Sequence, residues 1–265
     1  MKQRTLKLQR IYKEGSAYLE SRQIPDAQID AWYLLEYVTG ISRASYYGNP
    51  EKNISEEEAK RYWEYLEKRA RRIPLQHITG SQEFMGYEFL VNEHVLIPRQ
   101  DTENLVEEAL KVIRPDMYVL DMCTGSGCIL ISLLKYAAER KHITGGKAVG
   151  ADISADALEV AKKNAKLAGV ADRITFAKRD IKDFELNEGF MTVITNPPYG
   201  ERLLDVKSAE ELYKVMGEKF KRTQGKSYTI ITPDDDFEKI FGRKADKRRK
   251  LYNGTLKCQL YMYFK

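Results

Sequence analysis

Two kinds of hydrophobic spacing divide the chain into a helical front and a longer part in which strands and helices alternate. Over the first 70 residues, apolar side chains recur at helical spacing. One helix is predicted to end before Pro25 and a second at Gly40. A third begins with Ser55-Glu56-Glu57-Glu58, which has the spacing of a capping box, and runs toward Pro74. These segments predict a small helical domain over residues 1–74.

Aromatic residues are frequent in this front domain, and such side chains are more often core than docking surface. We therefore expect the following five in the core: Trp32, Tyr33, Tyr37, Tyr46 and Tyr47. Residues 75–100 are punctuated by Pro and Gly and predict a linker that carries a β-hairpin over residues 83–97. An amphipathic helix is predicted over residues 102–113, with Asp101 or Thr102 as its N-cap.

From residue 101 onward, short apolar runs alternate with helical segments, which is the pattern of parallel βαβ units. Helices are predicted from about Cys128 and over residues 157–169. The predicted strands lie near residues 117–122, 148–153, 173–177, 190–195, 227–232 and 255–264. The pattern therefore predicts one α/β domain over residues 101–265, built on a mostly parallel, doubly wound sheet.

The tetrapeptide Asn196-Pro197-Pro198-Tyr199 comes directly after the apolar run 191–195. Two prolines can continue neither a strand nor a helix, so the tetrapeptide is predicted to be a stiff loop at the C-terminal end of a strand. Open α/β sheets bind their ligands at that edge. An Asn amide and a Tyr ring held there suit a planar NH2 group, whereas the plainer interpretation is an ordinary proline turn.

A small-residue turn, Cys123-Thr124-Gly125-Ser126-Gly127, joins an apolar strand to an apolar helix. Its glycines allow positive φ and close approach of a ligand, and the helix N-terminus offers free N–H groups. The turn lacks the six-residue dinucleotide spacing, and no Gly-Lys-Ser/Thr follows it. The next two strands end in acids, at Asp152 and at Asp180-Ile181. Either acid could bind a nucleoside or simply cap a helix.

Together these features resemble the S-adenosylmethionine-dependent class I methyltransferases, in the branch that methylates planar amide or exocyclic amino nitrogens. The resemblance implies a Rossmann-like fold with a mostly parallel seven-stranded sheet whose last strand is antiparallel, and S-adenosylmethionine as cofactor. It also implies that residues 123–127 line the methionine moiety, that Asp152 holds the ribose hydroxyls, and that Asp180 and Ile181 meet the adenine. Many members of this superfamily have Gly at the position of Cys123.

Residues 72–103 closely resemble the release factor glutamine methyltransferases, in the Pro-Leu-Gln-His-Ile-Thr-Gly segment, the Glu-Phe hairpin and Ile-Pro-Arg-Gln-Asp-Thr-Glu. Gln100 stands where that family usually has a second proline. The resemblance implies a protein substrate, the glutamine N5 of the Gly-Gly-Gln motif in peptide chain release factors, which the front domain helps to bind. Asn196 and the Pro197 carbonyl would accept the N–H bonds of the amide, Pro198 would stiffen the loop, and Tyr199 would pack on the flat face of the amide.

The C-terminal third departs from that family. Residues 241–258 resemble the end of the bacterial ribosomal-RNA guanine-N2 methyltransferases, as do residues 157–169 and 173–176. The alternatives to a release factor enzyme are therefore an RNA guanine-N2 methyltransferase and a hybrid that binds S-adenosylmethionine without turnover. Residues 201–265 carry 16 Lys and Arg against 10 Asp and Glu, whereas residues 1–200 carry 28 against 29. The basic tail could contact RNA phosphates, or it could be solvated surface.

The remaining composition narrows the class of protein. No apolar run approaches the ~18 residues of a membrane span, and no signal peptide opens the chain, so a cytoplasmic protein without membrane contact is expected. The three cysteines (123, 128, 258) and three histidines (77, 94, 142) have no metal-ligand spacing, so no metal site is expected. We also expect a monomer.

Overall fold

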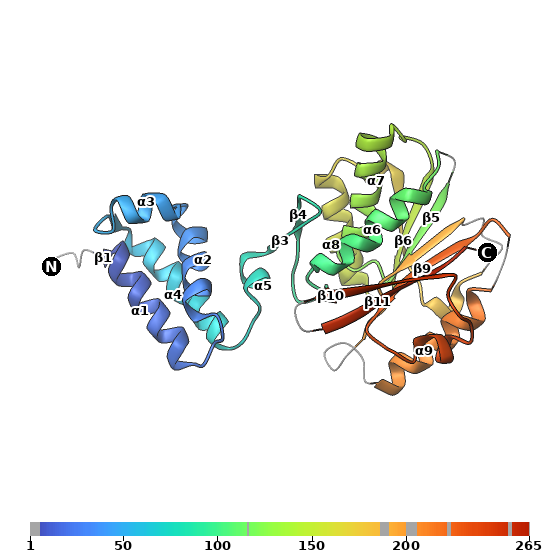
Figure 1. Cartoon of the computed structure of the whole chain (residues 1–265). Coiled ribbons are helices and arrows are strands. Elements are labelled where there is room, and N and C mark those ends of the chain that lie inside the picture. The colour runs from blue at the N-terminus through green and yellow to red at the C-terminus, as the bar shows by residue number, and fades with distance from the viewer. Residues whose placement is uncertain are drawn as a thin grey trace. The chain divides into compact units, whose positions relative to one another are not determined.

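The computed structural model describes residues 6–115, 117–185, 191–199, 206–221, 224–253 and 256–264. Two compact units divide the chain between Ser81 and Gln82 (Figure 1). The sequence analysis set residues 75–100 apart as a linker. In the structure, the short helix α5 (Leu75–Thr79) belongs to the first unit, and nearly all of the hairpin that follows belongs to the second.

The first unit is a small bundle of helices. It contains β1 (Leu6–Lys7), α1 (Leu8–Ser21), α2 (Ala27–Thr39), α3 (Arg43–Gly48), β2 (Asn53–Ile54), α4 (Glu56–Ala70) and α5. Helix α2 stops at Gly40, whose φ of 64° is the left-handed conformation that glycine adopts without strain. At the start of α4, the Ser55 hydroxyl accepts from the Glu58 N–H, and the Glu58 carboxylate accepts from the Ser55 N–H. Both helix ends therefore follow the predicted local signals.

The aromatic residues of the first unit divide between core and surface. Trp32 is 3% exposed and Tyr46 is 7% exposed, and their rings meet edge to face. Tyr33, Tyr37 and Tyr47 are about half exposed or more, so the prediction that all five lie in the core is wrong for these three. Tyr33 and Tyr37 are one helical turn apart on α2, and this places both on its outward face.

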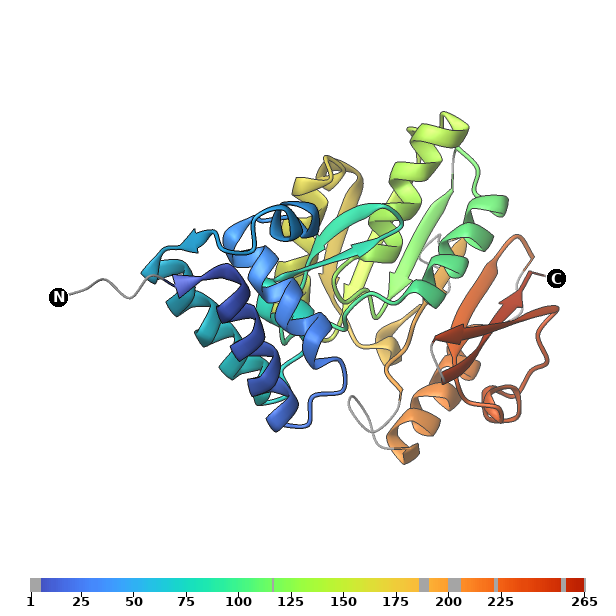
Figure 2. The same ribbon diagram turned by 60° about the vertical axis from the view of Figure 1, so that its left-hand side comes forward.

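The second unit is built on a seven-stranded sheet in the order β10-β11-β9-β8-β5-β6-β7 (Figure 2). Its strands are β5 (Tyr118–Met122), β6 (Lys147–Asp152), β7 (Ile174–Lys178), β8 (Thr192–Thr195), β9 (Ser227–Thr232), β10 (Lys247–Asn253) and β11 (Leu256–Tyr263). The β5, β6, β7, β8 and β9 pairings are parallel, whereas β11 is antiparallel to β9 and to β10. The predicted Rossmann-like α/β class is confirmed. A separate hairpin pairs β3 (Ser81–Phe84) with β4 (Tyr87–Leu90).

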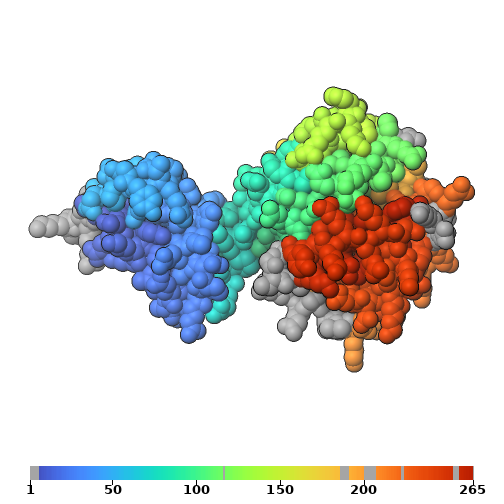
Figure 3. All heavy atoms as spheres, in the orientation of Figure 1, coloured from blue at the N-terminus to red at the C-terminus, as the bar shows by residue number. Residues whose placement is uncertain are grey.

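Strand β10 was not predicted as a strand. Its residues, Lys-Arg-Arg-Lys-Leu-Tyr-Asn, form the outer edge of the sheet, and Figure 3 shows the C-terminal segment, in red, at the surface of the second unit. Charged residues are typical of such edges because they discourage pairing with another chain. The β10 segment also lacks the alternation of apolar and polar residues by which a strand is usually recognised in a sequence. Thr255, where the last strand was predicted to begin, lies outside the described residues.

Helices cover both faces of this sheet. On one face pack α6 (Gln100–Val112) and α7 (Cys128–Lys141), with the C-terminal part of α8 (Ala155–Leu167); on the other pack α9 (Val206–Lys219) and α10 (Phe237–Phe241). Successive strand residues point to opposite faces, so Val119 joins the α6–α7 side and Leu120 the α9–α10 side. Because both faces are buried, the central strands are nearly continuous apolar runs.

Helix α6 begins earlier than predicted. Its N-cap is Arg99, which makes no side-chain cap bond, so the expectation that Asp101 or Thr102 caps this helix is wrong. Both residues lie within the first turn, where the Thr102 hydroxyl donates to Asp101 at 3.2 Å. Gln100 occupies the first helical position, which proline favours, and this is where the resembled family usually has its second proline.

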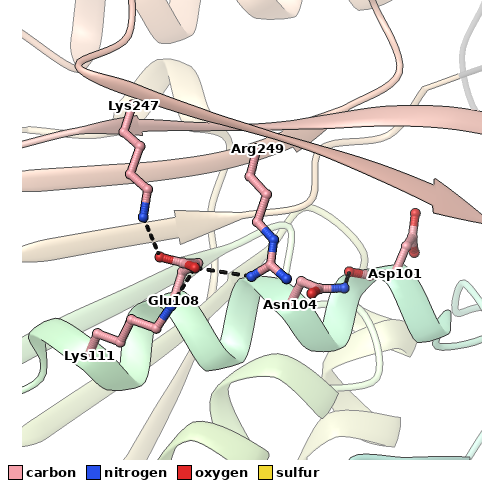
Figure 4. A network of polar contacts seen from close by, with 6 residues as sticks. All are labelled: Asp101, Asn104, Glu108, Lys111, Lys247 and Arg249. Atoms are coloured by element: carbon pink, nitrogen blue, oxygen red, sulfur yellow. Dashed lines mark hydrogen bonds and ion pairs between the residues drawn. The ribbon is translucent and has the colours of Figure 1, made fainter.

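One buried carboxylate joins α6 to the basic edge strand. Glu108 accepts from Lys111 at 2.6 Å, from Lys247 at 3.1 Å and from Arg249 at 3.1 Å (Figure 4). Burial alone would raise the pKa of Glu108, but the hydrogen bonds from Lys111 and Lys247 hold that pKa below its ordinary value. The side chains of Lys247 and Arg249 lie on the same face of β10 because they are two residues apart.

Replacing Glu108 with Gln should lower the free energy of unfolding by about 1–3 kcal/mol, since the hydrogen bonds from three cations to a buried charged group are lost. The carboxylate has a depressed pKa in the native state, so its contribution is present at neutral pH and is lost as the pH falls through that value. Urea unfolding at neutral and acid pH checks both points. Glu107→Gln is the control, because the Glu107–Arg140 pair is exposed and should contribute at most about 1 kcal/mol. Equal effects of the two substitutions would contradict this role.

Candidate active site

The predicted small-residue turn lies between β5 and α7. Cys123, Gly125 and Gly127 have φ of 62°, 54° and 79°, so three of its five residues are left-handed. Gly127 is the N-cap of α7, and a Cβ there would lie 3.0 Å from Ile131 and 3.2 Å from Ala161. The close packing of α7 on α8 therefore requires glycine. The left-handed Cys123 explains why the superfamily often has Gly at this position.

Asp121 lies directly below the turn and was not among the predicted site residues. It is fully buried at the centre of the sheet, and the Thr124 hydroxyl donates to its Oδ2 at 2.7 Å. Burial is the main reason that its pKa rises to about 7; the Thr124 hydrogen bond opposes the rise, and the charge of Asp152 adds to it. The sequence signal was present, because Asp121 is an acid inside an otherwise apolar strand.

The acid at the end of β6 holds the turn from the side. Asp152 Oδ2 accepts from the Gly125 N–H at 2.9 Å, and its Oδ1 accepts from the Ser154 N–H at 2.9 Å. Gly150, earlier in the same strand, leaves room for the Phe176 ring, since a Cβ there would come within 2.8 Å of it. The predicted ribose acceptor thus also fixes the backbone of the predicted methionine site.

Asp180 follows β7 and begins the short 3-10 helix Ile181–Asp183. Its Oδ1 accepts from the Lys182 N–H at 3.0 Å, so it has the helix-capping contact that the sequence analysis allowed. Ile181 is 4% exposed and packs in the core on the α9 side. Both residues nevertheless line the cavity described below.

The tetrapeptide follows β8 as an extended loop. Its start is tied to β5, because the buried Thr195 hydroxyl donates to the Met122 carbonyl at 2.6 Å. The Asn196 Oδ1 is buried and accepts no hydrogen bond from the described residues. An unsatisfied acceptor of this kind costs about 1–3 kcal/mol, so it indicates a place for a donor that the described residues do not supply.

A cavity of about 570 Å³ brings most of the predicted residues together. Its lining includes Cys123, Thr124, Gly125, Ser126, Asp152, Asp180, Ile181, Asn196, Pro197 and Pro198. Gly127 and Tyr199 are not part of the lining. The Tyr199 ring is buried instead, with the Arg99 guanidinium 5.9 Å from its centroid. Packing of Tyr199 on a substrate therefore stays a prediction.

Asn164 on α8 connects the turn to the hairpin and was also missed. Its amide nitrogen donates to the Ser126 carbonyl at 2.9 Å and to the Leu90 carbonyl at 3.0 Å, and its oxygen accepts from the Leu90 N–H at 2.8 Å. All its hydrogen-bonding groups are thus used by two segments far apart in sequence. A polar residue on the buried face of the predicted helix 157–169 was the available signal.

Comparison with known proteins places this geometry in a family. Residues 105–262 match the family described as "RMKL-like, methyltransferase domain", and residues 10–80 match the PrmC N-terminal domain. The release factor glutamine methyltransferase of Clostridium acetobutylicum is 37% identical over 198 residues, which cover 71% of this chain and 67% of that protein. The chain belongs to the release factor glutamine methyltransferase family. The Leptospira interrogans protein with the same name is 39% identical over 194 residues, which cover 71% of this chain and 66% of that protein.

The match covers only part of the length of these relatives. The chain spans about two thirds of the length of these curated relatives. A shorter stretch of 113 residues, 43% of this chain, is 42% identical to YpsC of Bacillus subtilis, whose name assigns it provisionally to the RNA methyltransferases; the stretch covers 29% of that protein. The sequence analysis predicted resemblance to a release factor group and to an RNA group of methyltransferases. Relatives with both kinds of name match the chain.

Solved structures agree with the fold. SMU.472, crystallised in complex with SAH, is 32% identical with a TM-score of 0.54, and the match covers 64% of this chain and 54% of that one. A possible methylase from Clostridium difficile 630 is 34% identical with a TM-score of 0.54, covering 63% and 53%. Within the described residues, no three His, Cys, Asp or Glu side chains are grouped to hold a metal ion. None of the helices that the structure describes is long and apolar enough to cross a membrane.

Cys123→Gly should keep or raise the free energy of unfolding, by up to about 1 kcal/mol, because glycine relieves the left-handed strain at φ 62°. Cys123→Val should lower it by about 1–3 kcal/mol, since a β-branched side chain tolerates this conformation poorly. Chemical denaturation of the three proteins measures both effects. A Gly variant less stable than the Val variant would mean that thiol packing outweighs backbone strain.

Asp121→Asn should remove part of the pH dependence of stability. The ordinary pKa of an Asp is 3.8, and the native structure raises the pKa of Asp121 to about 7. Between these two pH values Asp121 is protonated in the native chain and ionised in the unfolded chain. The stability of the wild type should therefore fall as the pH rises through that interval, and the Asn variant should lose this part of the fall. Unfolding free energies at several pH values across the interval measure it, and parallel curves for the two proteins would contradict it.

Proposed function

We propose that this chain is an S-adenosylmethionine-dependent methyltransferase that methylates the glutamine N5 of the Gly-Gly-Gln motif in peptide chain release factors. The observation that carries the proposal is the buried, unpartnered Oδ1 of Asn196 in the wall of the cavity, beside the left-handed turn. The names of the curated relatives supply the substrate class. A release factor substrate also places the enzyme with the translation machinery in the cytoplasm, and the monomer stays the expected state.

The cavity lining fits S-adenosylmethionine. N–H groups at the start of α7 would receive its carboxylate, because a helix N-terminus favours negative charge. Asp152 would accept the ribose hydroxyls, since each of its oxygens keeps a lone pair after accepting one backbone N–H. Asp180 and Ile181 would contact the adenine. The complex of SMU.472 with SAH supports this assignment. When bound, the cofactor supplies the methyl group.

The chain's own contribution to the reaction is orientation. An amide nitrogen is a poor nucleophile because its lone pair is delocalised into the carbonyl. The Asn196 Oδ1 and the Pro197 carbonyl would accept its two N–H bonds and aim the nitrogen into the cavity, while Pro198 limits the freedom of the loop. Correct orientation of this kind can contribute about 7–11 kcal/mol to lowering a barrier.

RNA guanine-N2 methylation is the second candidate, favoured by the 42% identity to YpsC. The basic edge strand could in principle meet phosphates. Lys247 and Arg249 are bonded to Glu108, however, and Arg248 lies 3.3 Å from Glu238. Three of its cations are thus at least partly neutralised within the protein, which lowers their attraction for RNA. The release factor remains the proposed substrate.

Labelled methyl transfer tests the two substrates in parallel. Purified release factor should accept the label, and the same factor with its Gly-Gly-Gln glutamine replaced should not. Label on unmodified ribosomal RNA alone would replace the proposed function with the second candidate. A folded chain that binds S-adenosylmethionine but labels neither substrate would support the hybrid without turnover.

Asn196→Ala should lower the transfer rate by about 10²–10³-fold, the range seen when one positioned hydrogen-bonding group is removed from an active site. S-adenosylmethionine binding, measured by calorimetry, should change little, since the other predicted cofactor contacts remain. Asn196→Asp keeps an acceptor oxygen and should retain more activity than Ala. Parallel loss of cofactor binding and transfer in the Ala variant would assign Asn196 a structural role.

A further inference from the structure

Arg99 stands at the wall of the cavity on the side of the tetrapeptide. It lies between Pro98 and the first residue of α6, and together with Pro98 and Thr102 it lines the cavity. Its guanidinium carbon is 5.9 Å from the centroid of the Tyr199 ring, so Arg99 lies beside the tetrapeptide. The sequence analysis assigned no role to this cation.

The donors of Arg99 are unused. Its side chain is half-buried, yet no acceptor among the described residues receives a hydrogen bond from it, and no described carboxylate pairs with it. Asp101, two residues along and also described, makes no ion pair with Arg99; its Oδ1 accepts from Thr102. By contrast, the half-buried Arg69 pairs with the carboxylate of Asp30 at 2.6 Å.

No Arg99 nitrogen is among the buried polar atoms of the described residues that lack a partner, so the guanidinium keeps contact with solvent. A cation within about 6 Å of an aromatic ring is attracted to its face, which favours the position of the guanidinium beside Tyr199. Because Arg99 lines the cavity and the described residues accept no hydrogen bond from it, its N–H groups are available to a bound group. A guanidinium binds carbonyl, carboxylate or phosphate oxygens.

We propose that Arg99 binds a carbonyl oxygen of the glutamine-bearing peptide and thereby helps to set the plane of the target amide. This rests on the proposed function and deepens it. Among the described residues, the Asn196 Oδ1 has no donor and the Arg99 guanidinium has no acceptor, and both residues line the same cavity. A peptide carboxamide supplies both complements, N–H donors and a carbonyl oxygen. A phosphate would satisfy Arg99 but not Asn196, which is why a peptide is favoured over RNA.

The test is binding of release factor to the SAH-loaded full chain, measured by calorimetry, together with steady-state methyl transfer. Arg99→Met keeps an unbranched apolar stem and removes the donors, and Arg99→Lys keeps the charge without the planar fork. We expect the Met variant to raise the Kd and the KM for release factor about 10- to 100-fold, the range of one lost charge-assisted hydrogen bond, with less loss in Lys. Affinity for SAH should not change.

Arg140→Met is the matched control. Arg140 is an exposed arginine whose guanidinium lies 3.9 Å from the centroid of the Tyr136 ring, on α7 and outside the cavity lining. Its loss removes a stacked cation without touching the site, so release factor binding should be unchanged. An Arg99→Met variant that binds release factor like the wild type, or that only loses thermal stability, would overturn the proposal and leave Arg99 as support for Tyr199.

The failure of this proposal is distinguishable from failure of the proposed function. If the wild type methylates release factor and the KM for release factor is unchanged in Arg99→Met, the proposed function stands and the proposed role of Arg99 is overturned. A wild type that neither binds nor methylates release factor overturns both. An Arg99→Met variant that loses affinity for a ribosomal-RNA oligonucleotide, but not for release factor, would assign the guanidinium to a phosphate.

Discussion

The left-handed turn from Cys123 to Gly127 is the constraint on which the candidate site depends. Three positive φ values within five residues reverse the chain tightly enough to start α7 directly above the end of β5. The turn is then held on three sides: from below by Asp121 through Thr124, from β6 by Asp152, and from α8 by Asn164. Each of these contacts comes from a different element, so the cavity exists only when the sheet and its helices are assembled.

The tetrapeptide is positioned by the same assembly. Parallel pairing puts the ends of β5 and β8 side by side, and the Thr195 hydroxyl joins them at the last residue pair. Pro197 and Pro198 then limit where the loop can go. A rigid loop beside a rigid turn leaves two polar groups with unmet hydrogen-bonding capacity, one acceptor in Asn196 and one cation in Arg99. Preorganised polar groups of this kind are what orientation-based catalysis requires.

The mixed relationships of the chain have a structural counterpart. All described residues that line the cavity belong to the second unit, so the proposed methyl-transfer site is built without described residues of the first unit. The basic residues near the C-terminus favour RNA when considered as composition, but Lys247, Arg248 and Arg249 of β10 each pair with an acid. Glu108 is the example. This buried carboxylate on α6 pairs with Lys111 on the same helix and with Lys247 and Arg249 on β10, so two of the basic residues connect β10 to α6.

The sequence by itself determined the features that depend on local stereochemistry. The stop of α2 at Gly40, the capping box at Ser55 and the positions of the central strands along the chain all follow from residue type and spacing. Tertiary structure decided the rest. The charged strand β10 pairs because β11 offers its free edge, and the tyrosines of α3 divide, with Tyr46 buried and Tyr47 exposed, by which side of the helix meets a neighbour. The pKa of Asp121 is raised because the sheet is covered on both faces. Burial and cross-element hydrogen bonds belong to no single segment, so no local pattern can carry them.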